Sequence, residues 1–138
     1  MNYKFELDIN ELDEVLTKLK DLIYNKNKII LLRGDIAIGK TTLVKAYMKY
    51  INIKDDVTSP TFCIQNIYSN NIFHYDIYNK TLEEFINLGL LEEFDKNGLH
   101  FVEWANDELE KIIKNYGFEF INIYIKKSNN KRIYEIYE

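Results

Sequence analysis

The spacing of hydrophobic and polar positions predicts an α/β fold from the first third of the chain. Alternation over residues 3–7 predicts a first strand. Asp8 with Glu11 resembles a capping box and predicts the start of a helix. The apolar face of that helix recurs at helical spacing and consists of Leu12, Val15, Leu16, Leu19 and Ile23.

An uninterrupted apolar run follows a turn at residues 25–27. The run spans Lys28–Arg33 and predicts a strand buried on both faces of a sheet. Apolar residues at helical spacing then predict a second helix from near Lys40 to about Ile51. A strand followed closely by a helix is the unit from which parallel sheets are built.

The middle of the chain predicts a hairpin and short helices. Strands at 63–68 and 72–78 flank Ser69-Asn70-Asn71, which is a turn signal. Thr81 with Glu84 fits a capping box and predicts a short helix to about Leu88. A further helical turn is predicted at 91–94.

The last third of the chain predicts another buried strand, a helix and a second hairpin. The strand is Leu99–Glu103, the helix is 106–114, and the hairpin joins 118–126 to 132–137. Together the patterns predict a three-layer α/β domain with a mixed sheet, whose core is parallel and whose flanking strands are antiparallel. The length of 138 residues predicts a single domain over 1–138.

The loop between the strand at Lys28–Arg33 and the helix after it carries the candidate chemistry. It reads Gly34-Asp35-Ile36-Ala37-Ile38-Gly39-Lys40-Thr41-Thr42 and fills every fixed position of the phosphate-binding motif G-x-x-x-x-G-K-[ST]. Glycines let the backbone approach a polyphosphate, and loop amides with the positive helix end attract it. Lys40 is placed over the β/γ-phosphates and the Thr41 hydroxyl is placed to ligate magnesium. The alternative is a Gly-rich turn that binds nothing.

Two carboxylates at predicted strand ends are candidates for holding magnesium or orienting water. Alternation places His74, Asp76 and Tyr78 on one face of their strand. Glu103 ends an apolar strand at its carboxyl end, where open α/β sheets bind ligands. Each carboxylate could instead be a helix cap or a solvated residue. We interpret His74 as a hydrogen-bonded structural histidine, and Trp104 as either a core residue or an aromatic wall for adenine.

The segment Ser59-Pro60-Thr61-Phe62 predicts a stiffened loop. Pro60 fixes its own φ and pushes Ser59 toward an extended backbone. Ser59 and Thr61 are either plain turn hydroxyls or groups that sense a γ-phosphate. Because the segment follows the helix of the phosphate-binding loop, Ser59, Pro60 and Thr61 are the predicted switch loop.

Composition and charge narrow the class of function. A net charge of −4 and only two arginines, Arg33 and Arg132, give no basic surface for nucleic acid and too few arginines for a small-molecule kinase site. Asp95-Lys96-Asn97-Gly98 fits D-x-x-G but precedes a strand, and no N-K-x-D occurs, so guanine specificity is not expected. The single cysteine, Cys63, excludes an internal disulfide. No apolar run approaches the length of a membrane span, so a cytoplasmic location is the default.

In order and spacing, these segments resemble the TsaE (YjeE) family of small bacterial ATPases. The matching stretches are 34–42, Ser59-Pro60-Thr61-Phe62, His74-Tyr75-Asp76-Ile77-Tyr78, Leu88-Gly89-Leu90 and Val102-Glu103-Trp104. The resemblance covers about residues 3–104. It implies an ATPase that acts with TsaB and TsaD to make threonylcarbamoyladenosine in tRNAs that read codons starting with adenosine.

The resemblance also implies ligands and roles. ATP would bind residues 34–42 and Trp104, with Mg²⁺ on Thr41, Glu103 and Asp76; Lys40, Asp76 and Glu103 would be catalytic. The partner would be a TsaB–TsaD complex, and tRNA would be reached only through it. The chain has Ala37-Ile38 where the family usually has Gly-Ala, which puts β-branched bulk where an unusual backbone is often needed, and Asn79 where it usually has Arg. Alternatives are a nucleotide-sensing module with negligible hydrolysis and a small P-loop kinase.

Overall fold

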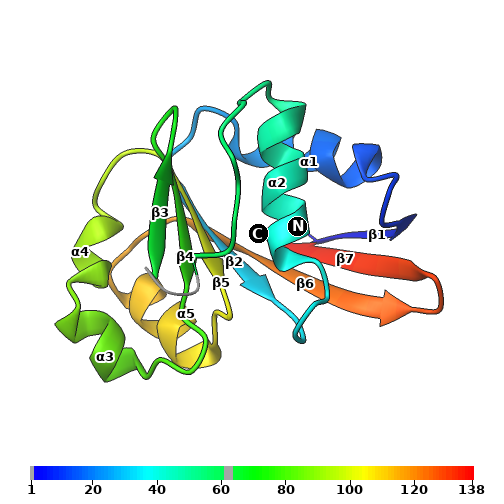
Figure 1. Ribbon diagram of the computed structural model, residues 1–138. Helices are drawn as coiled ribbons and strands as arrows, with labels where there is room; N and C mark the ends of the chain where they lie inside the picture. Colours follow the sequence, from blue (N-terminus) through cyan, green and yellow to red (C-terminus); the bar gives the residue numbers. More distant parts are fainter. Residues whose placement is uncertain (1, 61–63) are drawn as a thin grey trace.

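A computed structural model describes residues 2–60 and 64–138 (Figure 1). Its elements, in chain order, are β1 (Asn2–Asp8), α1 (Asp13–Ile23), β2 (Lys28–Arg33), α2 (Lys40–Tyr50), β3 (Gln65–Tyr68), β4 (Ile72–Asp76), α3 (Leu82–Asn87), α4 (Leu90–Glu93), β5 (Leu99–Glu103), α5 (Asp107–Asn115), β6 (Phe120–Ser128) and β7 (Lys131–Tyr137). In these residues no helix has both the length and the apolar character to cross a membrane.

All the strands belong to one mixed sheet of seven strands in the order β1-β7-β6-β2-β5-β4-β3. The four central strands, β6, β2, β5 and β4, pair in parallel. β3 pairs antiparallel with β4 at one edge, and β7 and β1 extend the other edge antiparallel. The predicted parallel core with antiparallel flanks is confirmed.

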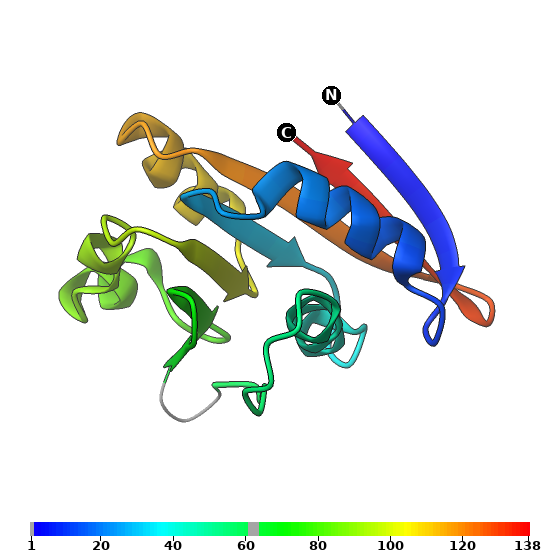
Figure 2. The ribbon, with the colours of Figure 1, turned by 90° about the horizontal axis from the view of Figure 1, so that it is seen from above.

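Helices cover both faces of the sheet, as Figures 1 and 2 show. α1 and α2 pack on one face, where Ile30 and Leu32 of β2 join their core; α3, α4 and α5 pack on the other, where Ile29 and Leu31 point. Burial on both faces explains why β2 is apolar at every central position instead of alternating.

The parallel pairing places three strand ends side by side. β2 leads into the phosphate-binding loop, β4 ends at Asp76, and β5 ends at Glu103. Asp76 and Glu103 are direct partners in the register of β4 and β5, and Leu32 is the partner of Glu103 on β2. The two predicted carboxylates and the loop therefore meet at the carboxyl ends of the central strands.

One predicted helix start is wrong and another is confirmed. α1 begins at Asp13 with Leu12 as its N-cap and no side-chain cap, whereas Asp8 and Glu11 form a backbone turn in which Glu11 N donates to Asp8 O at 2.9 Å. The chain needs that turn to leave the edge strand and bury Leu12 in the core, so the letters of the capping box fall one turn too early. At α3, Thr81 and Glu84 do form the reciprocal capping box.

Other boundaries differ by a few residues, and part of one prediction lies outside the described chain. β4 ends at Asp76 instead of residue 78 because the backbone turns at Asn79, where φ is 60°. Thr61 of the predicted switch loop, Phe62 and the predicted strand start at Cys63 fall outside the described residues. The pairing of β1 with β7 and of β6 with β2 joins segments that no local pattern links.

Candidate functional site

A hollow of about 530 Å³ opens at the carboxyl ends of the parallel strands. The loop lines it with residues 36–42, and the remaining lining residues are Ile9, Ser59, Asp76, Tyr78, Glu103 and Trp104. Of the predicted site residues that the structure describes, Gly34, Asp35 and Pro60 do not line the hollow. The sequence had given no sign of Ile9, which comes from the turn after β1.

Gly34, the first residue of the loop, packs tightly against Ile125 of β6. Gly34 has a φ of 152°, and a Cβ there would lie 2.7 Å from the carbonyl oxygen of Ile125 and 2.8 Å from Cγ2 of Ile38. A side chain at residue 34 would therefore push the loop away from β6. This is the close approach for which the motif needs its first glycine.

Lys40 is a buried lysine whose ammonium group lies inside the loop. Its Nζ donates to the carbonyl oxygens of Gly34 at 2.6 Å and Asp35 at 2.8 Å, and it lies 4.0 Å from the centre of the Trp104 ring. Burial lowers the pKa of Lys40, and neighbouring carboxylates, Glu103 first among them, act against that lowering. The cation is thus held at the base of the hollow by carbonyl groups and an aromatic face.

Glu103 is held on one of its two oxygens. The Thr41 hydroxyl donates to Glu103 Oε2 at 2.7 Å, and His74 Nε2 lies 2.5 Å from the same atom. The carboxylate is buried, with 4% of its surface exposed. The first residue after the motif lysine and the end of β5 are therefore in direct contact.

Asp76 is engaged separately, next to Glu103. The Ser59 hydroxyl donates to its Oδ2 at 3.0 Å, and the backbone N–H of Tyr78 donates to its Oδ1 at 3.0 Å. The structure thus brings Ser59, the described start of the predicted switch loop, to one of the candidate carboxylates.

These donors fit a magnesium ion that is shared with phosphate. Nowhere in residues 2–60 and 64–138 do three side chains of His, Cys, Asp or Glu form a cluster able to hold a metal alone. Mg²⁺ commonly keeps several waters and takes only one or two carboxylates together with substrate phosphates. A hydroxyl and two carboxylates beside a phosphate-binding loop are such a donor set.

Trp104 has an uncommon backbone for a large residue, with a φ of 65°. Left-handed conformations of bulky residues cost about 1–3 kcal/mol and cluster at functional sites. Its ring packs on Tyr78, with ring centroids 4.7 Å apart, and Tyr78 is about half exposed. The strain directs the indole from the end of β5 toward Lys40. Alternation alone had placed Tyr78 on the face of Asp76, but not beside Trp104.

The unusual residues of the loop have local explanations. The positive φ falls on Ala37, at 58°, while Ile38 is buried in the core and adds no β-branched bulk at that strained position. Arg132 of β7 donates from Nε to the carbonyl oxygen of Ile38 at 3.1 Å and so supports the loop from the sheet. No signal in the sequence links Arg132 to the loop, because the two are far apart along the chain.

Neither arginine lines the hollow. Arg33 lies one residue before the loop but points to α5 and β6, where Nη1 meets Asp107 at 2.6 Å, Nη2 meets Glu110 at 2.5 Å and Nε donates to Asn122 at 2.9 Å. Among the described residues that line the hollow, Lys40 is the only one with a cationic side chain.

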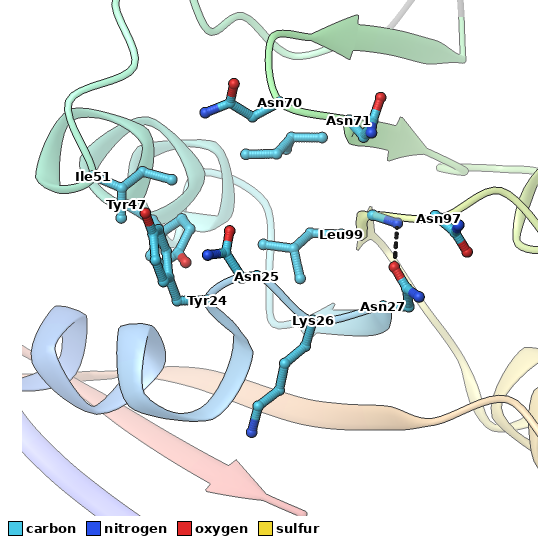
Figure 3. Close-up of a pocket in the computed structure, with 12 residues that line it drawn as sticks. Tyr24, Asn25, Lys26, Asn27, Tyr47, Ile51, Asn70, Asn71, Asn97 and Leu99 are labelled. Carbon is cyan, nitrogen blue, oxygen red and sulfur yellow. Dashed lines mark hydrogen bonds between the residues drawn. The ribbon is translucent and has the colours of Figure 1, made fainter.

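A second hollow, of about 200 Å³, lies at the amino ends of the central strands (Figure 3). Asparagines dominate its lining, but Asn25, Asn70 and Asn71 have left-handed backbones that turns require. Asn27 accepts a hydrogen bond from the backbone N–H of Gly98 at 2.8 Å. These residues are explained by the turns between elements, and no predicted site residue lies among them.

The family model "Threonylcarbamoyl adenosine biosynthesis protein TsaE" matches residues 7–134. The chain belongs to the TsaE family. The resemblance predicted from the motifs is thereby confirmed, and it extends beyond Trp104 to the last strand. TsaE membership gives the chain a role in the biosynthesis of threonylcarbamoyladenosine in tRNA.

Individual TsaE proteins and one solved structure agree. The "tRNA threonylcarbamoyladenosine biosynthesis protein TsaE" of Rickettsia typhi is 36% identical over 115 residues, which cover 80% of this chain and 77% of that protein. The protein of the same name from Bacillus subtilis is 31% identical over 115 residues, which cover 75% and 72%. The crystal structure of Bacillus subtilis YdiB superposes with a TM-score of 0.70 at 23% identity, over 99% of this chain and 84% of that one, and supports the fold.

The contact between Gly34 and β6 predicts a specific cost for a side chain there. We expect Gly34→Ala to lower the free energy of unfolding by about 2–4 kcal/mol, as the sum of left-handed strain and overpacking. Gly117→Ala is the matched control: its φ is 79°, but a Cβ would meet nothing within 4 Å, so we expect a loss of about 1 kcal/mol. Urea denaturation of both variants measures the difference. Equal losses would show that the loop does not press on Ile125.

Proposed function

We propose that this chain binds ATP with Mg²⁺ and hydrolyses it, slowly alone and faster when bound to a TsaB–TsaD complex. ATP hydrolysis is required for formation of the threonylcarbamoyl group on the adenosine next to the anticodon, in tRNAs that read codons starting with A. The observation that carries the proposal is the hydrogen bond of 2.7 Å from the Thr41 hydroxyl to Glu103, beside Lys40. It joins the phosphate-binding motif to a carboxylate in one site.

Phosphate binding is assigned to residues 34–42. The free backbone amides of the first turn of α2 form the positive end of that helix, which favours anions, and the amides of the loop come directly before it. The Lys40 ammonium would leave the carbonyl oxygens of Gly34 and Asp35 for the phosphates or share itself between them. Because its present partners are neutral carbonyl groups, a polyphosphate is the stronger attraction.

Magnesium is assigned to Thr41, Glu103 and Asp76. A bound Mg²⁺ would neutralise charge on the β/γ-phosphates. The Thr41 hydroxyl donates its hydrogen bond to Glu103, so the lone pairs of the Thr41 oxygen remain free for the ion. Glu103 and Asp76 have the oxygens that can hold the ion's waters and orient an attacking water. Trp104 and Tyr78 form an aromatic wall that can exclude bulk water or take the base.

A nucleotide-sensing module with negligible hydrolysis is the second candidate function. Its support is that Arg33 is bonded to α5 and β6, Arg132 is bonded to the carbonyl oxygen of Ile38, and neither side chain lines the hollow, so this chain offers no arginine to the transferred phosphate. A partner arginine can be worth 10³–10⁵ in rate in other phosphate-loop proteins. The same observation disfavours a kinase that must supply its own arginine cluster.

The partner proposal extends to location and to tRNA. The net charge of −4 gives no surface suited to the phosphates of tRNA, so tRNA contact is assigned to the partners. We place the protein in the cytoplasm with them.

The complete loop predicts stabilisation by Mg-ATP. At 100 times Kd, ligand linkage adds about 2.7 kcal/mol, which is roughly 5–10 °C in Tm for a chain of this size. Lys40→Ala should remove most of the shift, whereas Lys45→Ala, on an exposed position of the same helix, should keep it. Differential scanning fluorimetry measures both. A wild-type Tm that does not move at millimolar Mg-ATP would contradict nucleotide binding.

The two carboxylates should matter more for turnover than for binding. We expect Glu103→Gln and Asp76→Asn to lower kcat by about 100-fold or more, the usual scale for a lost general base, with a much smaller change in nucleotide Kd. The loop amides and Lys40 remain in both variants. Glu92→Gln, on the exposed side of α4, is the control. Steady-state turnover and equilibrium nucleotide binding would be compared, and parallel losses in both would mean that the carboxylates are structural.

The engagement of both arginines predicts slow hydrolysis by the isolated chain. Adding TsaB and TsaD from the same source should raise steady-state ATP turnover at least about tenfold, well within the range for an arginine supplied in trans. The proteins should also co-elute in the presence of ATP. Unchanged turnover together with no co-elution would contradict the partner assignment, and co-elution without faster turnover would favour the sensing module.

A further inference from the structure

A buried chain of contacts runs from Glu103 to a backbone carbonyl beside the predicted switch loop. His74 lies at its centre, in the middle of β4, with no exposed surface. Its Nε2 is 2.5 Å from Glu103 Oε2, and its Nδ1 is 3.0 Å from the hydroxyl of Tyr68. The Tyr68 hydroxyl also lies 3.1 Å from the carbonyl oxygen of Thr58, so its single proton is shared between His74 Nδ1 and that oxygen.

The contact with Glu103 restricts one carboxylate oxygen. An ionised carboxylate only accepts hydrogen bonds, so His74 Nε2 is the donor, and Oε2 receives both this bond and the one from Thr41. Two donors in different directions fix the rotation of the carboxylate. Among the hydrogen bonds that join described residues, none ends on Oε1, which keeps its lone pairs for groups in the hollow that Glu103 lines.

The fold alone does not require an imidazole at this position. The neighbours of His74 on this face of the sheet include Ile72 and Phe101, which belong to the apolar core under α2. A leucine of similar volume would fill such a site without the cost of burying a polar ring. That cost is offset only because both ring nitrogens have partners, and one partner is a candidate site residue.

A second contact ties the same segment to the other carboxylate. Ser59, the residue after Thr58, donates to Asp76 Oδ2 at 3.0 Å. Thr58 is thus linked to Glu103 through Tyr68 and His74, and Ser59 is linked directly to Asp76. A shift of either carboxylate changes what holds residues 58 and 59.

We infer that His74 is a positioning residue that holds Glu103 against Thr41 and, through Tyr68, couples that carboxylate to Thr58, the residue before the predicted switch loop. The inference rests on the proposed function, because it takes Glu103 as the group that serves magnesium and water. Loss of His74 leaves the loop amides and Lys40 in place. It therefore affects the metal requirement and kcat, and not the affinity for nucleotide.

The chain contains a matched control on the opposite face of the sheet. Tyr75 and His100 form a similar buried pair, with the tyrosine hydroxyl 2.7 Å from His100 Nδ1. His100 Nε2 lies 2.8 Å from the carbonyl oxygen of Lys96, far from either carboxylate along β5. Tyr75→Phe removes the same kind of bond as Tyr68→Phe, without touching the proposed site.

The first experiment compares His74→Leu, His74→Gln and Tyr75→Phe in steady-state ATP turnover as Mg²⁺ is varied. Partners that orient a metal-binding group typically contribute 10–100-fold to activity or metal affinity, so we expect His74→Leu to lower kcat by about 10–100-fold and raise the half-saturating Mg²⁺ concentration. KM for ATP should stay within about threefold, since loop binding is retained. The His74→Gln amide can donate from near the Nε2 position and should recover most of kcat. A fall in Tm with unchanged kcat and Mg²⁺ dependence would overturn the positioning role.

The second experiment needs no nucleotide and uses amide hydrogen exchange of residues 57–59. Tyr68→Phe removes the hydroxyl that holds the carbonyl oxygen of Thr58, so the segment should open more often and exchange faster than in wild type. Tyr75→Phe should leave it unchanged. Equal exchange in wild type and Tyr68→Phe would overturn the coupling. If wild type fails to bind ATP, only the proposed function falls, because the exchange comparison still decides the coupling. Both measurements stand without His74→Leu, should that variant not fold.

Discussion

Parallel pairing of β2, β5 and β4 is the constraint on which the rest of this structure depends. The register that sets Leu32 beside Glu103, and Glu103 beside Asp76, brings the phosphate-binding loop and both carboxylates together at the carboxyl ends of these strands. Parallel strands in turn need long crossovers, and α2, α3 and α4 supply them on the two faces. The core and the site are thus consequences of the same pairing: the middle of each strand is buried, and the last residues of β4 and β5 line the hollow.

The parts of the fold with strong local signals could be predicted from the sequence. The uniform apolar run of β2, the loop motif and the capping box at Thr81 each specify their own structure within a few residues. The start of α1 could not be predicted in this way, because Asp8 and Glu11 fit a cap by letter while burial of Leu12 decides where the helix begins. Local patterns also say nothing of which distant strands pair, so the places of β1 and β6 in the sheet came only from the structure.

The candidate site shows the same division. The motif identified Lys40 and Thr41, and strand ends pointed to Asp76 and Glu103, because period and position carry that information. The contacts of His74 with Glu103 and Tyr68 depend on three strands meeting in one register, and Arg132 reaches the loop from the last strand. Because such contacts are tertiary, residue type alone predicts only a hydrogen-bonded structural histidine at His74. The strained backbone of Trp104 was likewise outside what spacing can indicate.

The pairing of β1 with β7 has a consequence for how the chain reaches this structure. Asn2 pairs with Tyr137, and the register continues residue by residue to Asp8 with Lys131. During synthesis the segment that becomes β1 is made before the other strands of this sheet, yet its hydrogen-bonding partner β7 follows all of them, so the backbone groups of β1 stay unpaired until β7 is made. Contacts of such large sequence separation slow folding and leave strand edges open meanwhile. The edge formed by β1 and β7 can pair only after β7 has been made, while the strands around the loop can assemble earlier.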